Sequence, residues 1–252
     1  MGETTALLLV ARRASTVLAL ALELALAGCH GREPAAGKVE PNKYHAFFLW
    51  PGRRPPDLPG GPSEVYLLAG EVRGDYPGKL VPLRPVLPRV PRAAVWLTVR
   101  AERLDWSEDV YRDVVGELAR WQAAGNHVAG LQVDFDAATM GLGGYGQFLS
   151  SLRRRLPTRY RLSVTGLLDW SAHGDPAALA RLGGVVDEVV IQTYQGRRTI
   201  PGYQAYMASL ARLPLPHKIG LVEGGEWREP EGLARDRNFR GYVVFMLDRP
   251  PR

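Results

Sequence analysis

The chain has 252 residues, of which 46% are hydrophobic and 23% are charged, and its formal net charge is +6. This composition is typical of a globular protein and excludes a disordered or fibrous chain. The basic residues are scattered and accompany no nucleic-acid-binding motif, so we expect a solvated basic surface and no nucleic-acid partner.

The N-terminal segment has the layout of a secretory signal. Two arginines precede an apolar stretch over residues 15–27, which is short for a membrane span. The stretch ends in Leu26-Ala27-Gly28-Cys29, which resembles a bacterial lipoprotein signal, although Glu23 interrupts its apolar part. We therefore expect a signal peptide over residues 1–28, lipidation of Cys29, and an exported lipoprotein anchored to a membrane of the cell envelope. The alternative is a cleaved or membrane-anchored segment with an incidental cysteine.

The rest of the chain is expected to contain a flexible tether over residues 29–43 and one domain over residues 44–252. Strand-like apolar runs recur through this domain, and most are rich in Val, Ile and Leu rather than alternating, as in parallel strands buried on both faces. The eight runs are His45–Trp50, Val65–Val72, Ala94–Arg100, Val128–Asp136, Arg161–Trp170, Val186–Tyr194, Lys218–Gly225 and Gly241–Leu247.

Helical patterns lie between several of these runs. Residues 106–125 have an apolar stripe, with Ser107 as a possible cap and Gly125 as a possible end. Further helices are expected over residues 145–156, 175–182 and 203–213. In contrast, residues 51–64 and 73–93 are rich in Pro, Gly and Arg and show no helical period, so two outer helices are expected to be replaced by loops. Nothing long enough for a last helix follows Leu247.

Eight strands alternating with helices predict an α/β fold, a small (β/α)8 TIM-type barrel. An open doubly wound sheet is the alternative, but no glycine-rich phosphate loop follows the first strand.

The fourth run carries the strongest candidate site. Gln132, Asp134 and Asp136 are two residues apart, so they share one strand face and should line the barrel interior up to its C-terminal rim, where such barrels place catalytic residues. Repulsion between the two carboxylates should raise the pKa of at least one of them, as a general acid requires. Alternatively, one of the aspartates caps a loop or pairs with an arginine.

Other strand ends add polar and aromatic side chains that suit a sugar ligand. Tyr194 could hold substrate or be rim packing, and Trp170 could stack on a sugar or belong to the core. No metal-ligand spacing and no nucleophile elbow is present, so neither a metal nor a cofactor is expected. The candidates for substrate binding at these ends, besides Gln132, are Asp169, Trp170, Gln192, Gln195, Glu223 and Phe245.

The segment Ala129–Asp136 resembles the fourth-strand signature of family 18 glycoside hydrolases, the chitinase group, which reads Asp-x-x-Asp-x-Asp-x-Glu. Ala129 and Gln132 replace two of its acids, and Asp136 replaces the Glu. Asp134 keeps its place, which in the chitinases steadies the substrate's acetamido group. Thr193-Tyr194 and residues 241–248 resemble the sixth and last strands of that family.

A closer resemblance, over residues 44–247, is to an uncharacterised bacterial domain family of unknown function that has been grouped with glycosidase-like barrels. Its hallmarks occur here at residues 134–136, 165–170, 190–196 and 220–222. This resemblance implies the barrel architecture more directly than an activity.

Two hypotheses of function follow. The first is a glycoside hydrolase acting on envelope or extracellular polysaccharide, with Asp136 as general acid, Asp134 as its electrostatic partner, and Tyr194 with Gln192 holding the substrate. A variant of it pairs Asp136 with Glu223 as nucleophile. The second is a non-catalytic glycan-binding or scaffold lipoprotein on a degenerate barrel.

Overall fold

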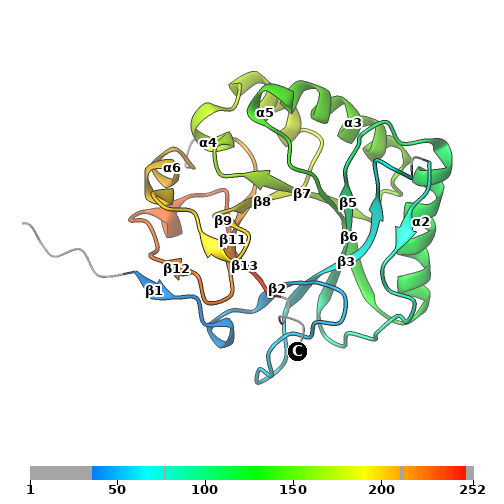
Figure 1. Ribbon diagram of the computed structural model, residues 1–252, viewed down its shortest axis with the longest axis horizontal. Coiled ribbons are helices and arrows are strands. Elements are labelled where there is room, and N and C mark those ends of the chain that lie inside the picture. Colours follow the sequence, from blue (N-terminus) through cyan, green and yellow to red (C-terminus); the bar gives the residue numbers. More distant parts are fainter. Residues whose placement is uncertain (1–35, 77, 211–212, 248–252) are drawn as a thin grey trace, which may run out of the picture. The chain divides into compact units, whose positions relative to one another are not determined.

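The computed structural model describes residues 36–76, 78–210 and 213–247. Eight parallel strands close into a barrel in sequence order, because each pairs with the next and β13 pairs with β2 (Figure 1). This closure confirms the TIM-type barrel and excludes the open sheet. The barrel strands are β2 (Ala46–Leu49), β3 (Glu64–Val72), β5 (Ala94–Ala101), β6 (His127–Asp134), β7 (Arg161–Leu167), β8 (Glu188–Gln192), β11 (His217–Val222) and β13 (Phe239–Phe245).

Short antiparallel strands decorate this barrel. β4 (Val81–Pro82) extends the sheet beside β3. The other short strands form two separate pairs, β9 (Tyr194–Gln195) with β10 (Arg198–Thr199) and β1 (Gly37–Lys38) with β12 (Glu226–Trp227).

The outer helices lie where the sequence predicts them, with shifted ends. Ser107 caps the first one by accepting a hydrogen bond from the Val110 backbone, and Asp175 caps another in the same way through Ala177. The α-helices are α2 (Glu108–Ala123), α3 (Leu142–Arg155), α4 (Trp170–His173), α5 (Pro176–Gly183) and α6 (Tyr203–Leu210), and the 3-10 helices are η1 (Pro41–Lys43), η2 (Thr139–Gly141) and η3 (Leu233–Arg235). None of the helices in the described ranges is long and apolar enough to cross a membrane.

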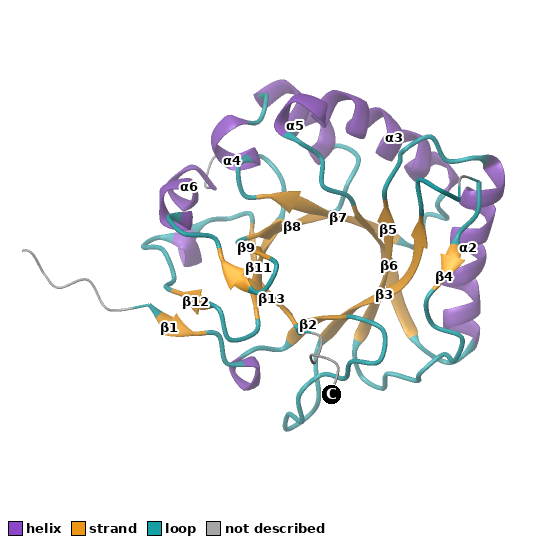
Figure 2. Ribbon diagram, in the orientation of Figure 1, coloured by secondary structure: helices purple, strands orange, loops and turns teal. Residues whose placement is uncertain are grey.

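The helical layer is incomplete. In the described part of the chain, no helix lies between β2 and β3 or between β3 and β5, as the Pro- and Gly-rich segments predict. Figure 2 shows loops outside β2, whereas helices follow the wall formed by β5 to β8. In the described residues, the connection from β11 to β13 contains only the short strand β12 and η3, so it lacks an outer α-helix as well.

Several boundaries differ from the sequence predictions, and β6 ends at Asp134 rather than at Asp136. Residues 37–43, expected within a flexible tether, belong to the compact unit that starts at Gly37. Val39 is 2% exposed and exchanges backbone hydrogen bonds with Gly224 and Gly225, so burial of one apolar side chain holds this segment. The fifth strand ends at Leu167, and the chain then turns into α4, which begins at Trp170. Cys29 and the expected signal peptide lie outside the described residues.

The barrel has an apolar core on each side of its wall. Residues that point outward pack against the helices in the larger core. Inward-pointing side chains form a second core, and alternation along the strands separates the two. The inner core contains Ala46, Phe48, Tyr66, Leu68, Trp96, Val190, Val243 and Phe245.

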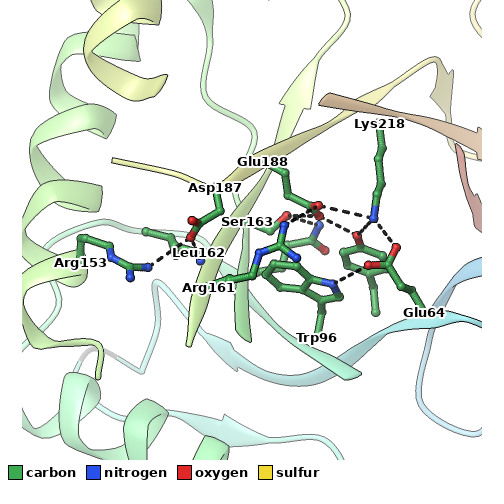
Figure 3. A network of polar contacts seen from close by, with 11 residues as sticks. Glu64, Trp96, Arg153, Arg161, Leu162, Ser163, Asp187, Glu188 and Lys218 are labelled. Atoms are coloured by element: carbon green, nitrogen blue, oxygen red, sulfur yellow. Dashed lines mark hydrogen bonds and ion pairs between the residues drawn. The ribbon is translucent and has the colours of Figure 1, made fainter. Parts of the chain in front are cut away.

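A buried ionic cluster closes the end of the barrel where the strands begin (Figure 3). Lys218 lies between the carboxylates of Glu64 and Glu188 and donates to the Tyr66 hydroxyl at 2.9 Å. The Tyr66 hydroxyl in turn donates to Glu188 at 2.6 Å. Arg161 covers the cluster, 3.5 Å from Glu188 and stacked on Trp96. Polar groups therefore fill the base of the barrel, and the opposite end is left for a cleft.

Candidate active-site cleft

A cleft of about 920 Å³ opens at the C-terminal ends of the barrel strands, the end at which barrel enzymes place their catalytic groups. Seven of the predicted site residues line it and are thereby brought together from the ends of three neighbouring strands, β6 to β8, and from the last strand, β13. They are Asp134, Asp136, Asp169, Gln192, Tyr194, Gln195 and Phe245.

Asp134 is the last residue of β6 and is held on both carboxylate oxygens. Thr165 on β7 donates to Oδ1 at 2.9 Å, and Arg100 on β5 donates to Oδ2 through Nε at 3.2 Å and Nη2 at 3.1 Å. The Arg100 guanidinium also lies over the Trp50 ring, 4.7 Å from its centroid. The predicted alternative, pairing of one aspartate with an arginine, is therefore confirmed for Asp134.

Asp136 stands two residues beyond the strand and makes no hydrogen bond or ion pair with the described residues. Its carboxyl is open to solvent on one side, while the cleft wall removes part of its water. This burial, together with the charge of Asp134, raises the pKa of Asp136 above its usual range, and Arg100 opposes the shift. A carboxylic acid that keeps its proton more readily is suited to donate it to a leaving group.

Asp169 enters the cleft from the loop after β7. It occupies the N-cap position of α4, yet its side chain makes no capping hydrogen bond. Its Oδ1 is buried and accepts no hydrogen bond from the described residues. The carboxylate is thus placed in the cleft without a structural task.

An aromatic row forms one wall of the cleft. The Tyr194 ring lies 4.9 Å from that of Phe245, which stacks on Phe48 at 4.5 Å, and Phe48 meets Trp50 edge-on at 5.5 Å. Burial raises the pKa of Tyr194 well above its usual value, so its hydroxyl stays neutral and can donate or accept a hydrogen bond. Flat apolar faces beside polar groups suit the two-sided surface of a sugar ring.

Three predicted substrate-binding residues do not line the cleft. Gln132 is fully buried lower in the barrel, where it accepts from Thr98 and donates to Ser163. Trp170 is fully buried among the outer-core residues, and its Nε1 donates to the Ala137 carbonyl at 2.8 Å. It therefore offers no face to a sugar, and the core interpretation applies.

Glu223 is the third. It follows β11 at the correct end of the barrel, but Arg53 donates to its Oε2 at 3.3 Å and the Leu247 backbone donates to the same oxygen at 2.9 Å. Glu223 thereby links the loop after β11 to the segments that follow β2 and β13. A pairing of Glu223 with Asp136 as nucleophile therefore has no support in the geometry.

The sequence reasoning missed Trp50, Arg100 and Glu102, which also line the cleft. Arg100 could have been found from strand spacing, because Trp96, Thr98 and Arg100 share the inward face of β5. Trp50 follows directly after β2 at the same rim. Within the residues that the structure describes, no group of three or more His, Cys, Asp or Glu side chains is arranged to hold a metal ion.

The family comparison matches the central part of the chain. Residues 88–205 match the family described as Domain of unknown function (DUF3142). This range includes the motifs at residues 134–136, 165–170 and 190–196 but not residues 220–222, so it confirms the resemblance to a domain family of unknown function over that part. A comparison with curated proteins gave no match.

Solved structures include barrels that are similar to this chain. The spore cortex-lytic enzyme SleL of Bacillus cereus is 17% identical over 75% of this chain and 52% of its own, with a TM-score of 0.48. This chain thus spans about half the length of the SleL chain. The chitinase domain of the spore coat protein CotE from Clostridium difficile is 13% identical, with coverages of 77% and 67% and a TM-score of 0.49. A tamarind chitinase-like lectin is 11% identical, with coverages of 80% and 94% and a TM-score of 0.47.

Proposed function

We propose that this protein is a glycoside hydrolase that acts on a polysaccharide of the cell envelope or the extracellular space. The observation that carries the proposal is the position of Asp136, an unpartnered acid with a raised pKa inside an aromatic-walled cleft at the catalytic end of a barrel. Asp136 donates a proton to the glycosidic oxygen. Asp134, clamped by Arg100 and Thr165, supplies a fixed negative charge beside it.

The polar groups of the aromatic wall orient the sugar in this proposal. Tyr194 carries a neutral hydroxyl beside the Phe245 ring, and Gln192 and Gln195 offer amides at the same strand end. Amides and phenols are donors and acceptors at once, as sugar hydroxyls are, so each can pair with them in either direction.

A second candidate function is glycan binding without catalysis. The observation in its favour is that both oxygens of Asp134 are already occupied, so this residue is not available as a base or nucleophile without losing partners. In that case Arg100 and Asp134 serve to shape a lectin-like cleft.

A hydrolysis screen separates the two. The purified domain is incubated with a panel of neutral, amino and N-acetylated polysaccharides, and new reducing ends are counted. Asp113→Asn, on the exposed face of α2, is the matched control for Asp136→Asn. It removes the same charge, but at a site that does not line the cleft. We expect release by wild type and by the control. Binding of a glycan without any release by wild type supports the second candidate instead.

We also propose that the exported chain is lipidated at Cys29 and held at a membrane of the cell envelope. The support is the Leu26-Ala27-Gly28-Cys29 sequence after a short apolar stretch.

A further inference from the structure

The carboxylates near the cleft differ in how many hydrogen-bond and ion-pair partners they have within the chain. Asp134 accepts hydrogen bonds on both oxygens, and Glu223 is bound by Arg53 and the Leu247 backbone away from the cleft lining. Glu102, at the cleft edge, is bound to the Gly74 backbone at 2.7 Å. Only Asp136 and Asp169, among the acids that line the cleft in the described residues, have no partner in the chain.

The fold holds Asp136 and Asp169 at neighbouring strand ends. β6 and β7 are adjacent parallel strands, and each aspartate stands two residues beyond the end of its strand. The residues that follow them are joined directly, because the Trp170 indole donates to the Ala137 carbonyl at 2.8 Å. Since Trp170 is fully buried, this bond fixes the two loops against each other and thereby fixes the two carboxyls at neighbouring strand ends of the cleft.

The Asp169 carboxylate also lacks the structural role that its position suggests. An aspartate at a helix N-cap normally accepts a backbone hydrogen bond in the first turn, but Asp169 makes none. Its Oδ1 is buried without a donor, which costs free energy. The residue nevertheless lines the cleft, so its carboxylate is held there without a hydrogen bond from the described residues.

We propose that Asp169 is the second carboxylate of the active site and acts as the general base that activates water. The proposal rests on the proposed glycosidase function and deepens it. Asp136 gives its proton to the glycosidic oxygen as the bond from the anomeric carbon breaks and its electron pair stays on that oxygen. Water attacks the anomeric carbon, and Asp169 accepts the proton that the water loses. Proton exchange with solvent then restores both carboxyls.

Two consequences follow from this assignment. Attack by water on the face opposite the leaving group inverts the anomeric configuration. The substrate also needs no 2-acetamido group, because the nucleophile is a water molecule activated by Asp169 and not a group of the substrate. A chitinase-like route, in which the acetamido group is the nucleophile, requires that group and retains the configuration.

The experiment compares Asp169→Asn, Asp169→Ala and Asp136→Asn in the whole domain on dinitrophenyl glycosides with and without a 2-acetamido group. An activated leaving group needs no proton, so Asp136→Asn should lose less than about tenfold, whereas Asp169→Asn should lose about 10²-fold or more. Azide, which fits the space left in Asp169→Ala, should restore turnover there but not in Asp136→Asn. NMR of the first product should show the inverted anomer.

The outcomes separate this inference from the proposed function. Thermal unfolding midpoints within a few degrees of wild type show that the variants are folded, and Asp113→Asn controls for charge. If wild type and Asp136→Asn behave as expected but Asp169→Asn keeps its turnover, or if the product is the retained anomer, Asp169 is not the base. If wild type cleaves no substrate in the panel, the proposed function falls, and the role of Asp169 falls with it.

Discussion

Asp134 ends β6 and Asp136 stands two residues beyond it, and the two differ in their surroundings. Asp134 is 9% exposed and clamped by Arg100, whereas Asp136 has no partner and a raised pKa. In the proposed function, these two chemically identical side chains have different roles: Asp134 is a fixed charge and Asp136 is the proton donor.

This division predicts opposite shifts in the pH dependence of turnover. A general acid is active when protonated, so turnover falls as pH rises through the pKa of Asp136. Asp134→Asn removes a charge that raises this pKa, so the alkaline limb should move to lower pH. Arg100→Gln removes a charge that lowers it, so the limb should move to higher pH.

The measurement is kcat against pH for both variants on one substrate. Both limbs should move by more than the fitting error of the pH profile, in opposite directions, because the charges of Asp134 and Arg100 act on Asp136 with opposite sign. Shifts in the same direction, or none, would mean that Asp136 is not the group that controls the limb.

The role of Arg100 was not predicted from the sequence. The spacing of Gln132, Asp134 and Asp136 placed three side chains on one face, but partners on neighbouring strands depend on register. Arg100 pairs with Asp134 because β5 and β6 align these two residues directly. Trp170 was ambiguous for a similar reason, since its burial depends on where β7 ends.

At the scale of elements, the ionic cluster at the base of the barrel joins β3, β8 and β11. Lys218 and Glu188 have side chains that are 7% and 2% exposed. Removing one member of such a cluster leaves a buried charge without compensation, which is the costly change for buried ion pairs.

Lys218→Met should therefore lower the free energy of unfolding by about 3 kcal/mol, because Glu64 and Glu188 lose the cation between them and only the partly exposed Arg161 remains beside Glu188. Chemical denaturation measures this, with Lys79→Met, at an exposed site, as control. Equal stability of Lys218→Met and the control would show that the charges of Glu64 and Glu188 do not depend on Lys218 for compensation.

The elements were predictable to different degrees. The eight barrel strands are long or strongly apolar runs, and burial on both faces makes such runs visible in one sequence. β1 and α4 were not predicted, because they are only two and four residues long and depend on tertiary contacts rather than on a periodic pattern. The Pro- and Gly-rich segments at residues 51–64 and 73–93 correctly indicated two missing helices.

At the scale of the whole molecule, stability should depend on pH through His217. This side chain is fully buried at the start of β11, and burial lowers its pKa below 6.5, with Arg240 adding to the shift and the Leu215 carbonyl and Asp236 opposing it. Below pH 6.5 the unfolded chain binds a proton at this residue that the folded chain does not. The free energy of unfolding should therefore fall as pH decreases from about 6.5 toward the lowered pKa.

Urea denaturation of wild type and His217→Gln at pH 7.5, 6.5 and 5.5 tests this. The loss of stability on acidification should be smaller in the variant, because the protonation difference is gone. A loss of equal size in both proteins would assign the pH dependence to other groups.

The proposed lipid anchor also concerns the whole chain. Cys29→Ala removes the only cysteine, so the exported protein should shift from the detergent phase to the aqueous phase or remain unprocessed. Detergent partitioning and mass spectrometry of the N-terminus measure this. An unmodified Cys29 within an uncleaved chain would refute the anchor and leave the cleft chemistry unaffected.

The central claim is that Asp136 is a catalytic acid, and its most direct test measures turnover and affinity of Asp136→Asn on the same glycan. The amide keeps the shape of the side chain and removes its proton. We predict that the Kd changes by less than about threefold while kcat falls about 10²-fold or more. A wild-type protein that binds the glycan without cleaving it, with the same Kd in Asp136→Asn, would contradict the catalytic role and identify a binding protein.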